Sequence, residues 1–542
     1  MNGIISIPPP VNEPIKTYAP GSPERESLKK RLDQMLEEDL DIPAIIGGKE
    51  VRTGKTIPVV CPHDHKHRLG QAHQVSEKEV QQAIEAARAA WKVWSETPWE
   101  ARAAVVLKAG ELLAGPWRDT INASTMLGQS KTVFQAEIDS ACEIVDFYRF
   151  NTHYMRQIYE QQPISSPGIW NYVEYRPLEG FVFAVSPFNF TSIGANLPVS
   201  PALMGNVVLW KPASTSLLSN YYVMKLLQAA GLPDGVINFV PGRGASVGNP
   251  VFASPDFAGL HFTGSTETFQ GMWRTIANTL PDYHGYPRIV GETGGKDFVF
   301  AHPSADVTAL VVALVRGAFE YQGQKCSAAS RAYVPQSLWP QVKKGLVDTL
   351  AEVKMGAPTD FRNFMCAVID EASFKNIGGY IEEAKSSGTY DILSGGKMGG
   401  AKGWYIEPTV VVTKDPRARL MREEIFGPVL TLYVYSDSDL DKALELCDTT
   451  SPYALTGGIF ATDRQAIVKM AAALRHAAGN FYVNDKPTGA VVGQQPFGGA
   501  RASGTNDKAG SALNLLRWIS QRLIKESFVP PADYRYPHMG AE

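Results

Sequence analysis

The residues that most clearly suggest covalent chemistry lie around Cys326, in the segment YQGQKCSAAS. Gly323 predicts a turn, Lys325 adds a positive charge, and the small residues that follow predict the start of a helix. A helix N-terminus lowers the pKa of a thiol and favours the nucleophilic thiolate. By residue type alone a lone cysteine is more often a buried apolar side chain, but none of the other four cysteines has this setting.

Two further polar residues lie next to short apolar runs. Glu292, in IVGETGGKD, precedes a glycine turn, and burial there would raise the pKa of its carboxyl group into the range of a general base. Asn189, in SPFNF, has a side-chain amide that can donate a hydrogen bond to a developing oxyanion. The alternatives are a capping or surface glutamate and an asparagine that satisfies a turn.

A third group of residues suggests phosphate binding. In HFTGSTET, Gly264, Ser265 and Thr266 follow a strand and open a helix, where backbone N–H groups can bind a pyrophosphate. Lys211, at the end of the strand in VVLWKPAS, could contact a ribose or a phosphate. The glycines of PGRGASVG do not have the G-x-G-x-x-G spacing and indicate little alone.

Histidines alternate in CPHDHKHR, the segment from Cys61 to Arg68. Alternation puts Cys61, His63, His65 and His67 on one face of a strand, so metal binding is conceivable. The spacing matches no structural zinc pattern, and Lys66 and Arg68 add positive charge. We therefore predict an exposed strand or turn here and no metal site.

The elements that must position these residues begin with short apolar strands separated by helices. Strands are predicted at 181–186, 207–210, 236–240 and 258–262, after two amphipathic helices that begin near Ser76 and Thr97. This alternation predicts a parallel sheet, and ligands bind at the carboxyl ends of such strands. A second α/β series runs from about 298 to 488. We predict a two-stranded flap at 168–180, a strand-like stretch near the C-terminus that pairs with it or with another subunit, and a solvated surface helix within the first 45 residues.

Composition limits the function classes. The chain has 542 residues, a net charge of −3 and 44% hydrophobic residues, which predicts a large globular enzyme of several domains. The near-balance of charge argues against a general nucleic-acid binder, and no apolar run is long enough to cross a membrane. Five scattered cysteines argue against a disulfide framework, and together with the absence of a recognisable targeting peptide they predict a cytoplasmic location.

Taken together and in order, these segments resemble the aldehyde dehydrogenase superfamily. The motifs that carry the resemblance span most of the chain: SPFNF, WKPAS, FTGST, ETGGKD, GQKCSA, EEIFGP and QPFGGARASGTN. The resemblance implies an α/β fold with a Rossmann-type NAD-binding domain, an α/β catalytic domain and a small β oligomerisation flap. The implied boundaries are an N-terminal arm at 1–45, a cofactor domain at 46–164 and 184–291, a catalytic domain at 292–488, and an oligomerisation element at 165–183 and 505–542.

The resemblance also implies a mechanism, in which Cys326 attacks an aldehyde, Asn189 stabilises the oxyanion and Glu292 activates the water that hydrolyses the thioester. The implied reaction is the NAD-dependent oxidation of L-glutamate 5-semialdehyde to L-glutamate. The implied partners are a small-molecule substrate and a second copy of the chain, in a homodimer or a multiple of dimers. The implied cofactor residues are Ser186, Lys211, Gly264, Ser265, Thr266, Glu267, Thr268 and Glu424, and the implied substrate residues are Glu143, Phe190, Lys325, Ser327, Gly489, Ala490 and Phe497.

Two positions depart from the family pattern. Ala490 stands where the animal enzymes usually have serine, which removes one hydroxyl donor to the substrate. Ser214 stands where many NAD-preferring relatives have a glutamate that repels a 2′-phosphate, so we expect NAD with some use of NADP. The alternatives are a CoA-acylating enzyme, an enzyme for another semialdehyde such as succinate semialdehyde, and a non-catalytic protein on the same fold. The presence of both Cys326 and Glu292 argues against the first and the last.

Overall fold

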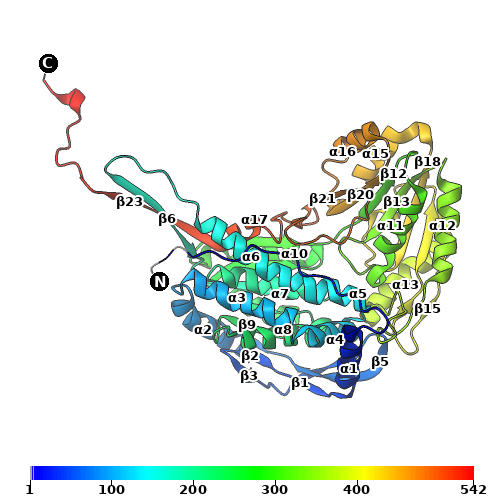
Figure 1. Cartoon of the computed structure of the whole chain (residues 1–542), viewed down its shortest axis with the longest axis horizontal. Helices are drawn as coiled ribbons and strands as arrows, with labels where there is room; N and C mark the ends of the chain where they lie inside the picture. Colours follow the sequence, from blue (N-terminus) through cyan, green and yellow to red (C-terminus); the bar gives the residue numbers. More distant parts are fainter. Residues whose placement is uncertain (1–2, 4, 542) are drawn as a thin grey trace.

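The computed structural model describes residues 3 and 5–541 and contains two large sheets (Figure 1). Residues 1, 2 and 4 of the predicted arm, and residue 542 of the predicted oligomerisation element, lie outside the described residues. Among the described residues, no helix combines the length and apolar character needed to span a bilayer.

The first sheet has seven strands, of which five adjacent ones are parallel because helices connect them. Two short strands near the N-terminus extend it in antiparallel orientation. The four strands predicted between 181 and 262 are confirmed with small differences at their ends. The order is β11 (Arg288–Glu292), β10 (Phe257–Thr263), β7 (Phe181–Val185), β8 (Val207–Lys211), β9 (Ile237–Phe239), β2 (Ala44–Ile46) and β3 (Lys49–Val51).

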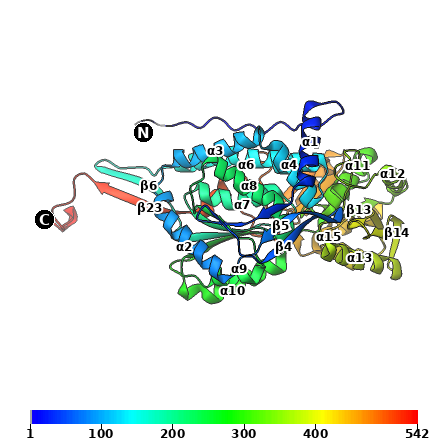
Figure 2. The same ribbon diagram turned by 90° about the horizontal axis from the view of Figure 1, so that it is seen from below.

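Helices cover both faces of this sheet (Figure 2). The helix predicted from Ser76 is confirmed, with the capping box between Ser76 and Glu79. The helices are α2 (Glu77–Trp94), α3 (Trp99–Ala114), α4 (Arg118–Gln129), α5 (Val133–Ala136), α6 (Ile144–Tyr159), α7 (Thr191–Leu203), α8 (Leu217–Ala230), α9 (Gly244–Phe252) and α10 (Thr266–Thr279).

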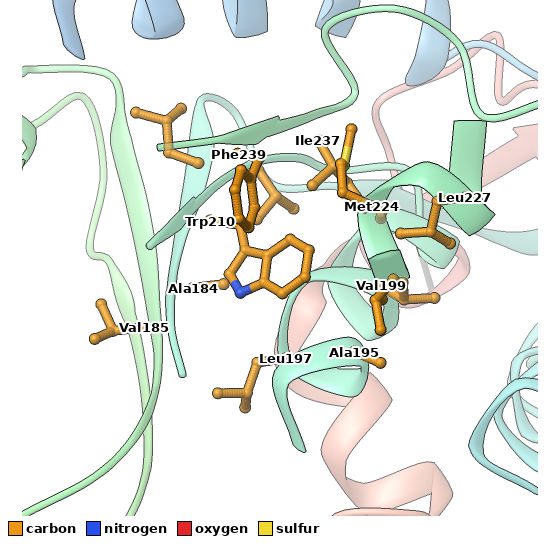
Figure 3. Close-up of a cluster of buried hydrophobic side chains, with 14 of the residues drawn as sticks. Ala184, Val185, Ala195, Leu197, Val199, Trp210, Met224, Leu227, Ile237 and Phe239 are labelled. Atoms are coloured by element: carbon orange, nitrogen blue, oxygen red, sulfur yellow. The ribbon is translucent and has the colours of Figure 1, made fainter. Parts of the chain in front are cut away.

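Buried apolar side chains hold the helices against the sheet. Figure 3 shows Trp210 of β8 at the centre of one such cluster, facing Leu197 of α7 and Phe239 of β9. The indole of Trp210 meets the Phe239 ring edge-on, with 5.2 Å between centroids. Burial of large apolar side chains of this kind stabilises the fold by about 1.5–3 kcal/mol each. The packing fixes the carboxyl ends of β7 and β8, where the predicted cofactor residues follow.

The second sheet is also seven-stranded and lies in the C-terminal half of the chain. Six of its strands run parallel, and β14 at one edge is antiparallel. The order is β14 (Tyr390–Ser394), β17 (Thr409–Thr413), β18 (Val429–Tyr435), β13 (Ala329–Pro335), β12 (Asp297–Ala301), β20 (Thr456–Phe460) and β21 (Asn480–Val483). Its helices are α11 (Val307–Phe319), α12 (Trp339–Glu352), α13 (Glu371–Ser386), α14 (Arg419–Arg422), α15 (Leu440–Thr449) and α16 (Arg464–Ala473).

Two long strands project from the body of the molecule (Figure 1). The prediction that 168–180 folds on itself is wrong, because β6 (Ile169–Pro177) is one strand. Its partner is β23 (Ile519–Ser527), in nine antiparallel residue pairs from Ile169 with Ser527 to Pro177 with Ile519. The prediction that these distant segments pair with each other is therefore confirmed. The helix α17 (Ala512–Leu515) precedes β23.

The remaining strands form three small sheets. They are β1 (Leu40–Ile42) with β5 (Asp64–His73) and β4 (Thr56–Cys61), β15 (Met398–Gly399) with β16 (Tyr405–Ile406), and β19 (Tyr453–Ala454) with β22 (Ala500–Arg501).

The N-terminal helix α1 (Pro23–Glu37) lies where the charged helix was predicted. It is a surface helix as predicted, with Lys29 and Asp33 exposed, but Leu28, Leu32 and Met35 are buried on one of its sides.

Candidate active site

Cys326 lies in the turn that precedes β13 of the second sheet. The preceding 3-10 turn, Glu320–Gly323, has left-handed backbone at Tyr321, Gln322 and Gly323, and β13 begins three residues after the cysteine. A side chain at Gly323 would collide with the carbonyl oxygen of Gly427, so glycine is required there. The predicted helix start at Cys326 is wrong, since the small residues that follow enter a buried strand.

The thiol of Cys326 is consequently not activated by a helix. Burial raises the pKa of this thiol well above its usual value, and the carboxyl groups of Glu292, Asp297 and Glu424 raise it further. The resting side chain therefore carries its proton. A base within the site must remove that proton before the sulfur can act as a nucleophile.

Glu292 is the last residue of β11 and lines the same cavity as Cys326. Its backbone pairs with Gly504, which belongs to the QPFGGARASGTN segment, and its carbonyl accepts a hydrogen bond from Gly264 N–H at 3.2 Å. Burial raises the pKa of the carboxyl group to about 8, with a further increase from Asp507 and an opposing effect from Lys508. A carboxylate in this range can exchange protons near neutral pH.

Asn189 lies just beyond the end of β7 and is buried. Its Nδ2 donates a hydrogen bond to the Gln324 carbonyl at 3.1 Å, which places the amide beside the turn that carries Cys326. The amide has a second N–H, which can donate to a substrate oxygen.

The N-terminus of α7 follows directly after Asn189 and Phe190. It is held by Asp139, which forms a buried ion pair with Lys131 that the sequence analysis did not identify. Asp139 accepts hydrogen bonds from the backbone N–H groups of Thr191 at 3.0 Å and Ser192 at 2.9 Å. Asp139 belongs to a π-helix, Glu137–Glu143, that interrupts the helical layer. Such π-helical turns often occur at functional sites, but no sequence pattern marks this one.

A cavity of about 440 Å³ lies at Cys326 and Glu292, and Asn189 is not among the residues that line it. All seven of the predicted substrate residues line it, together with Cys326 and Glu292. They are Glu143, Phe190, Lys325, Ser327, Gly489, Ala490 and Phe497. Most of them come from different elements, so the cavity exists only in the folded chain.

Lys325, Ser327 and Glu143, three of the predicted substrate residues, each have a polar partner. Lys325 Nζ lies 3.2 Å from Glu320 Oε2, and Ser327 Oγ donates to Thr488 Oγ1 at 2.8 Å. Glu143 accepts a hydrogen bond from Ser192 Oγ at 2.9 Å, and burial raises the pKa of its carboxyl group to about 8. Gly489 has a φ of 96°, a left-handed conformation that favours glycine.

The predicted cofactor residues follow the carboxyl ends of the first sheet. Ser186 Oγ, after β7, accepts a hydrogen bond from Trp210 Nε1 at 3.0 Å. Lys211, at the end of β8, is buried, donates to the Pro212 carbonyl at 3.2 Å, and has its pKa lowered to about 8 by that burial. This buried cation keeps two N–H groups for ligand oxygens, such as ribose hydroxyls.

The helix α10 begins where a pyrophosphate was predicted to bind. Ser265 caps the helix by accepting a hydrogen bond from Thr268 N–H at 3.3 Å, and Ser265, Glu267 and Thr268 are exposed. Gly264 and Thr266 are half-buried beside them. The free N–H groups and the helix dipole suit an anionic ligand.

Glu424 reaches the site from the segment between α14 and β18. Its Oε1 accepts a hydrogen bond from Gly295 N–H at 2.9 Å, and burial raises the pKa of its carboxyl group to about 7. A buried carboxylate beside Gly294 can accept hydrogen bonds from ribose hydroxyls. The cation, the helix N-terminus and this carboxylate together fit a dinucleotide.

No residue of the histidine segment is among those that line this cavity. The ring of His65 stacks on Trp404 with 4.5 Å between centroids, and its Nε2 lies 3.0 Å from the Gly400 carbonyl. The Nε2 of His67 lies 3.0 Å from the Leu36 carbonyl. Within the described part of the chain, no three His, Cys, Asp or Glu residues are grouped to hold a metal ion.

Comparison with known proteins places this geometry in context. The family model described as "Aldehyde dehydrogenase family" matches residues 50–522. Delta-1-pyrroline-5-carboxylate dehydrogenases from Dictyostelium discoideum and Homo sapiens are 56% and 49% identical, over 98% and 97% of this chain and 96% and 94% of theirs. The crystal structure of the Delta-pyrroline-5-carboxylate dehydrogenase from Mycobacterium tuberculosis bound with NAD matches with a TM-score of 0.97 and 52% identity, over 100% of both chains.

The prediction of a cytoplasmic location is wrong. Similar proteins from Dictyostelium discoideum, Danio rerio and Homo sapiens are named as mitochondrial enzymes. The prediction failed because few, scattered cysteines indicate only that thiols stay reduced, which does not distinguish one reducing compartment from another. The match of the family model over most of the chain, and the extent of identity to these relatives, show that the chain belongs to the aldehyde dehydrogenase family.

Proposed function

We propose that the protein oxidises L-glutamate 5-semialdehyde, the hydrolysed form of 1-pyrroline-5-carboxylate, to L-glutamate with NAD, the second step of proline catabolism. The observation that carries the proposal is one cavity that contains Cys326, Glu292 and the turn at Gly489 and Ala490. Relatives about half identical over nearly their whole length are named for this substrate, which supports the same assignment here.

In the proposed reaction, Cys326 is the nucleophile. Its thiol gives up the proton to a carboxylate in the site, and the sulfur adds to the aldehyde carbon to form a thiohemiacetal. The oxygen that becomes negative accepts hydrogen bonds from the Asn189 amide and the Cys326 backbone N–H. NAD, when bound, supplies the acceptor for the hydride that leaves this carbon, and Cys326 is then left as a thioester.

Glu292 acts in the second half of the reaction. Its ionised carboxyl group accepts a proton from water as the water oxygen attacks the thioester carbon. The carbon–sulfur bond breaks, glutamate leaves, and the sulfur of Cys326 regains a proton. The position of Glu292 in the same cavity as Cys326, with a pKa raised to about 8, supports this role because it can exchange protons near neutral pH.

The amino-acid end of the substrate is proposed to bind at the part of the cavity that Gly489 and Ala490 line. Backbone N–H groups at Gly489 and Ala490 receive the carboxylate, since consecutive N–H groups bind anions well. The rings of Phe190 and Phe497 pack on the aliphatic chain. Ser327 helps hold the substrate, and Glu143 and Lys325 support the entrance.

The cofactor is proposed to lie across the carboxyl edge of the first sheet. Ser186 and Lys211 would hold the adenosine side, residues 264–268 the pyrophosphate, and Glu424 the nicotinamide ribose. In this assignment residues 46–164 and 184–291 form the cofactor domain and residues 292–488 the catalytic domain. Ser214 is exposed after β8, and a serine there does not repel a 2′-phosphate, so some use of NADP is proposed as well.

The oligomer is proposed to be a homodimer or a multiple of dimers that meet through the oligomerisation element at 165–183 and 505–542. In support, β6 and β23 extend away from the body (Figure 1), and Trp170 and Leu523 on them are 51% and 64% exposed. Exposed apolar side chains on a projecting ribbon favour association with another copy. Light scattering of the purified protein measures the number of copies.

A substrate comparison tests the proposed function. The purified protein is given 1-pyrroline-5-carboxylate, succinate semialdehyde and propanal, each with NAD, and NADH formation is followed with and without CoA. We expect the highest kcat/KM with 1-pyrroline-5-carboxylate and no dependence on CoA. A higher kcat/KM for either other aldehyde, a requirement for CoA, or no turnover at all would each contradict the proposal.

A further inference from the structure

Residues 11–18, which we call the strap, cross the surface as an extended segment before α1. Figure 1 and Figure 2 show this N-terminal trace running along α6 toward α1. Three residues of the strap, Asn12, Glu13 and Ile15, line the cavity that contains Cys326. The N-terminal arm therefore contributes directly to the site, although it lies more than three hundred residues before Cys326 in the sequence.

Asn12 connects two walls of that cavity. Its Nδ2 donates to Asp146 Oδ2 on α6 at 2.8 Å and to the Val492 carbonyl at 2.8 Å. Its Oδ1 accepts a hydrogen bond from Gln494 Nε2 at 2.9 Å. Val492 and Gln494 belong to residues 489–495, which we call the Gly489 loop and which include Gly489 and Ala490. One side chain thus ties this loop to α6.

Charged groups hold the strap in place around Asn12. The backbone N–H of Glu13 donates to Asp146 Oδ1 at 2.7 Å, so the two oxygens of one carboxylate hold two consecutive strap residues. The carboxylate of Glu13 lies 2.6 Å from Arg118 Nη1 and 2.9 Å from Arg149 Nη1. Hydrogen bonds between ionised, partly buried groups are among the stronger ones in proteins.

The far end of the strap is fixed in the same way. Glu137 accepts hydrogen bonds from Lys16 N–H at 2.8 Å and from the Tyr18 hydroxyl at 2.9 Å. Glu137 and its partner Arg118 are both buried, and Tyr18 is 2% exposed. The strap is therefore anchored on both sides of the cavity lining, and Asn12 is presented to the Gly489 loop by a rigid support.

We propose that the strap is a selectivity element: through Asn12 it holds the Gly489 loop in the position that receives the amino-acid end of the substrate. The inference rests on the proposed function, because it takes the Gly489 loop as the carboxylate-binding part of the site. A loop that has lost these bonds samples more conformations, and ordering it when the substrate binds costs binding free energy. This loss of binding free energy falls on aldehydes with an amino-acid end and much less on plain aldehydes, which have no carboxylate for the Gly489 loop to bind.

The test compares Asn12→Ala with the wild-type protein, using 1-pyrroline-5-carboxylate and propanal with saturating NAD. We expect KM for 1-pyrroline-5-carboxylate to rise about tenfold, with kcat changed about twofold or less, because about one net hydrogen bond is lost from the bound state. We expect the KM for propanal to change by about twofold or less. The exposed residue Thr17 lies in the same strap, and Thr17→Ala serves as the matched control with wild-type constants for both substrates.

A double-mutant cycle with Gln494→Ala separates positioning from general loss of structure. If Asn12 acts through the loop, the double variant raises KM no more than the larger single change, since neighbouring partners are not additive. Equal increases in KM for both aldehydes, or a KM for 1-pyrroline-5-carboxylate within twofold of wild type in both single variants, would overturn the inference. Failure of the proposed function is recognised separately, because the wild-type protein itself would then fail the comparison of 1-pyrroline-5-carboxylate with succinate semialdehyde and propanal.

Discussion

Lys131 and Asp139 form an ion pair of 2.6 Å whose side chains are both completely buried. The ammonium group of Lys131 also lies over the Phe190 ring, 4.1 Å from its centroid. Because Asp139 accepts the two N–H groups that open α7, the pair fixes the backbone immediately after Asn189. The candidate oxyanion donor is therefore positioned by residues that do not line the cavity.

Asp139→Asn tests this arrangement. The variant leaves the Lys131 ammonium buried without a counter-charge, and breaking such a pair costs about 3–5 kcal/mol of unfolding free energy. We also expect kcat/KM to fall, because the N-terminus of α7 loses an ionised acceptor. Urea denaturation followed by circular dichroism measures the first effect and NADH formation the second.

An exposed ion pair supplies the control for that experiment. Lys344 and Asp348 lie one helical turn apart on α12, and their side chains are 77% and 59% exposed. Asp348→Asn is expected to change the unfolding free energy by less than about 1 kcal/mol. The interpretation fails if the Asp139 and Asp348 variants lose similar stability.

The pH dependence of the second half-reaction follows from Glu292. Its pKa is raised to about 8, so the carboxyl group is mostly protonated below that pH and cannot accept a proton from water. The rate of thioester hydrolysis is therefore expected to rise with pH and to level off above about 8. Steady-state turnover over a pH series measures it, provided that burst kinetics show hydrolysis to be rate-limiting.

Glu292→Gln removes this ionisation while keeping the size of the side chain. We expect a rapid burst of NADH of about one equivalent per site, followed by slow turnover that no longer shows the rise near pH 8. Rapid mixing with absorbance detection separates the two phases. A variant in which the burst itself is slowed and hydrolysis is unaffected would show that Glu292 acts before the thioester forms.

The strands of the first sheet were predictable because each is marked by a short apolar run in the sequence. The run FVFAV at β7 is completely buried, and a continuous apolar run bounded by turns is what a buried parallel strand requires. The helix predicted at Cys326 is absent because the local sequence there fits two structures. Small residues such as Ser327 and Ala328 suit a helix start as well as a tight entry into β13. The strand forms because β13 pairs with β12 and β18 inside the second sheet.

The strap and the buried pair could not be predicted. Lys131 and Asp139 are only eight positions apart, but Asp139 belongs to a π-helical turn that no sequence pattern marks. The contacts of the strap join distant parts of the chain. Asn12 meets Asp146 across 134 positions and Val492 across 480, and nothing in the sequence near Asn12 records either partner. A single polar residue in an extended segment has the same local pattern whether it faces solvent or a cavity. The chemistry of Cys326 and Glu292 was visible from residue types, whereas the residues that position the site required the fold.

Asn189→Ala tests the oxyanion contact. Removing one such donor typically lowers the rate of the assisted step about 10²–10³-fold, because the charge develops only in the transition state. We expect the rate of the NADH burst to fall by that factor while the affinity for NAD, measured by fluorescence quenching, stays within about twofold. A large loss of NAD affinity would instead indicate that Asn189 supports the fold of the cofactor site.

Ala490→Ser tests the departure from the animal enzymes. The added hydroxyl group can donate a hydrogen bond to the carboxylate of the substrate, and a hydrogen bond to a charged group is worth about 1.5–3 kcal/mol. We expect KM for 1-pyrroline-5-carboxylate to fall about tenfold, with no change for propanal. An unchanged KM would indicate that the backbone donors of Gly489 and residue 490 already satisfy the carboxylate.

Ser214→Glu tests cofactor choice. Ser214 is exposed at the start of a short 3-10 helix, three residues after the buried Lys211. A carboxylate there would repel a 2′-phosphate, and we expect kcat/KM with NADP to fall about tenfold while the value with NAD changes about twofold or less. Ser214→Gln is the control, since it has nearly the same size and no charge. Repulsion between exposed charges weakens with salt, so the loss with NADP should shrink between low and high ionic strength. Equal losses in the two variants would assign the effect to size and not to charge.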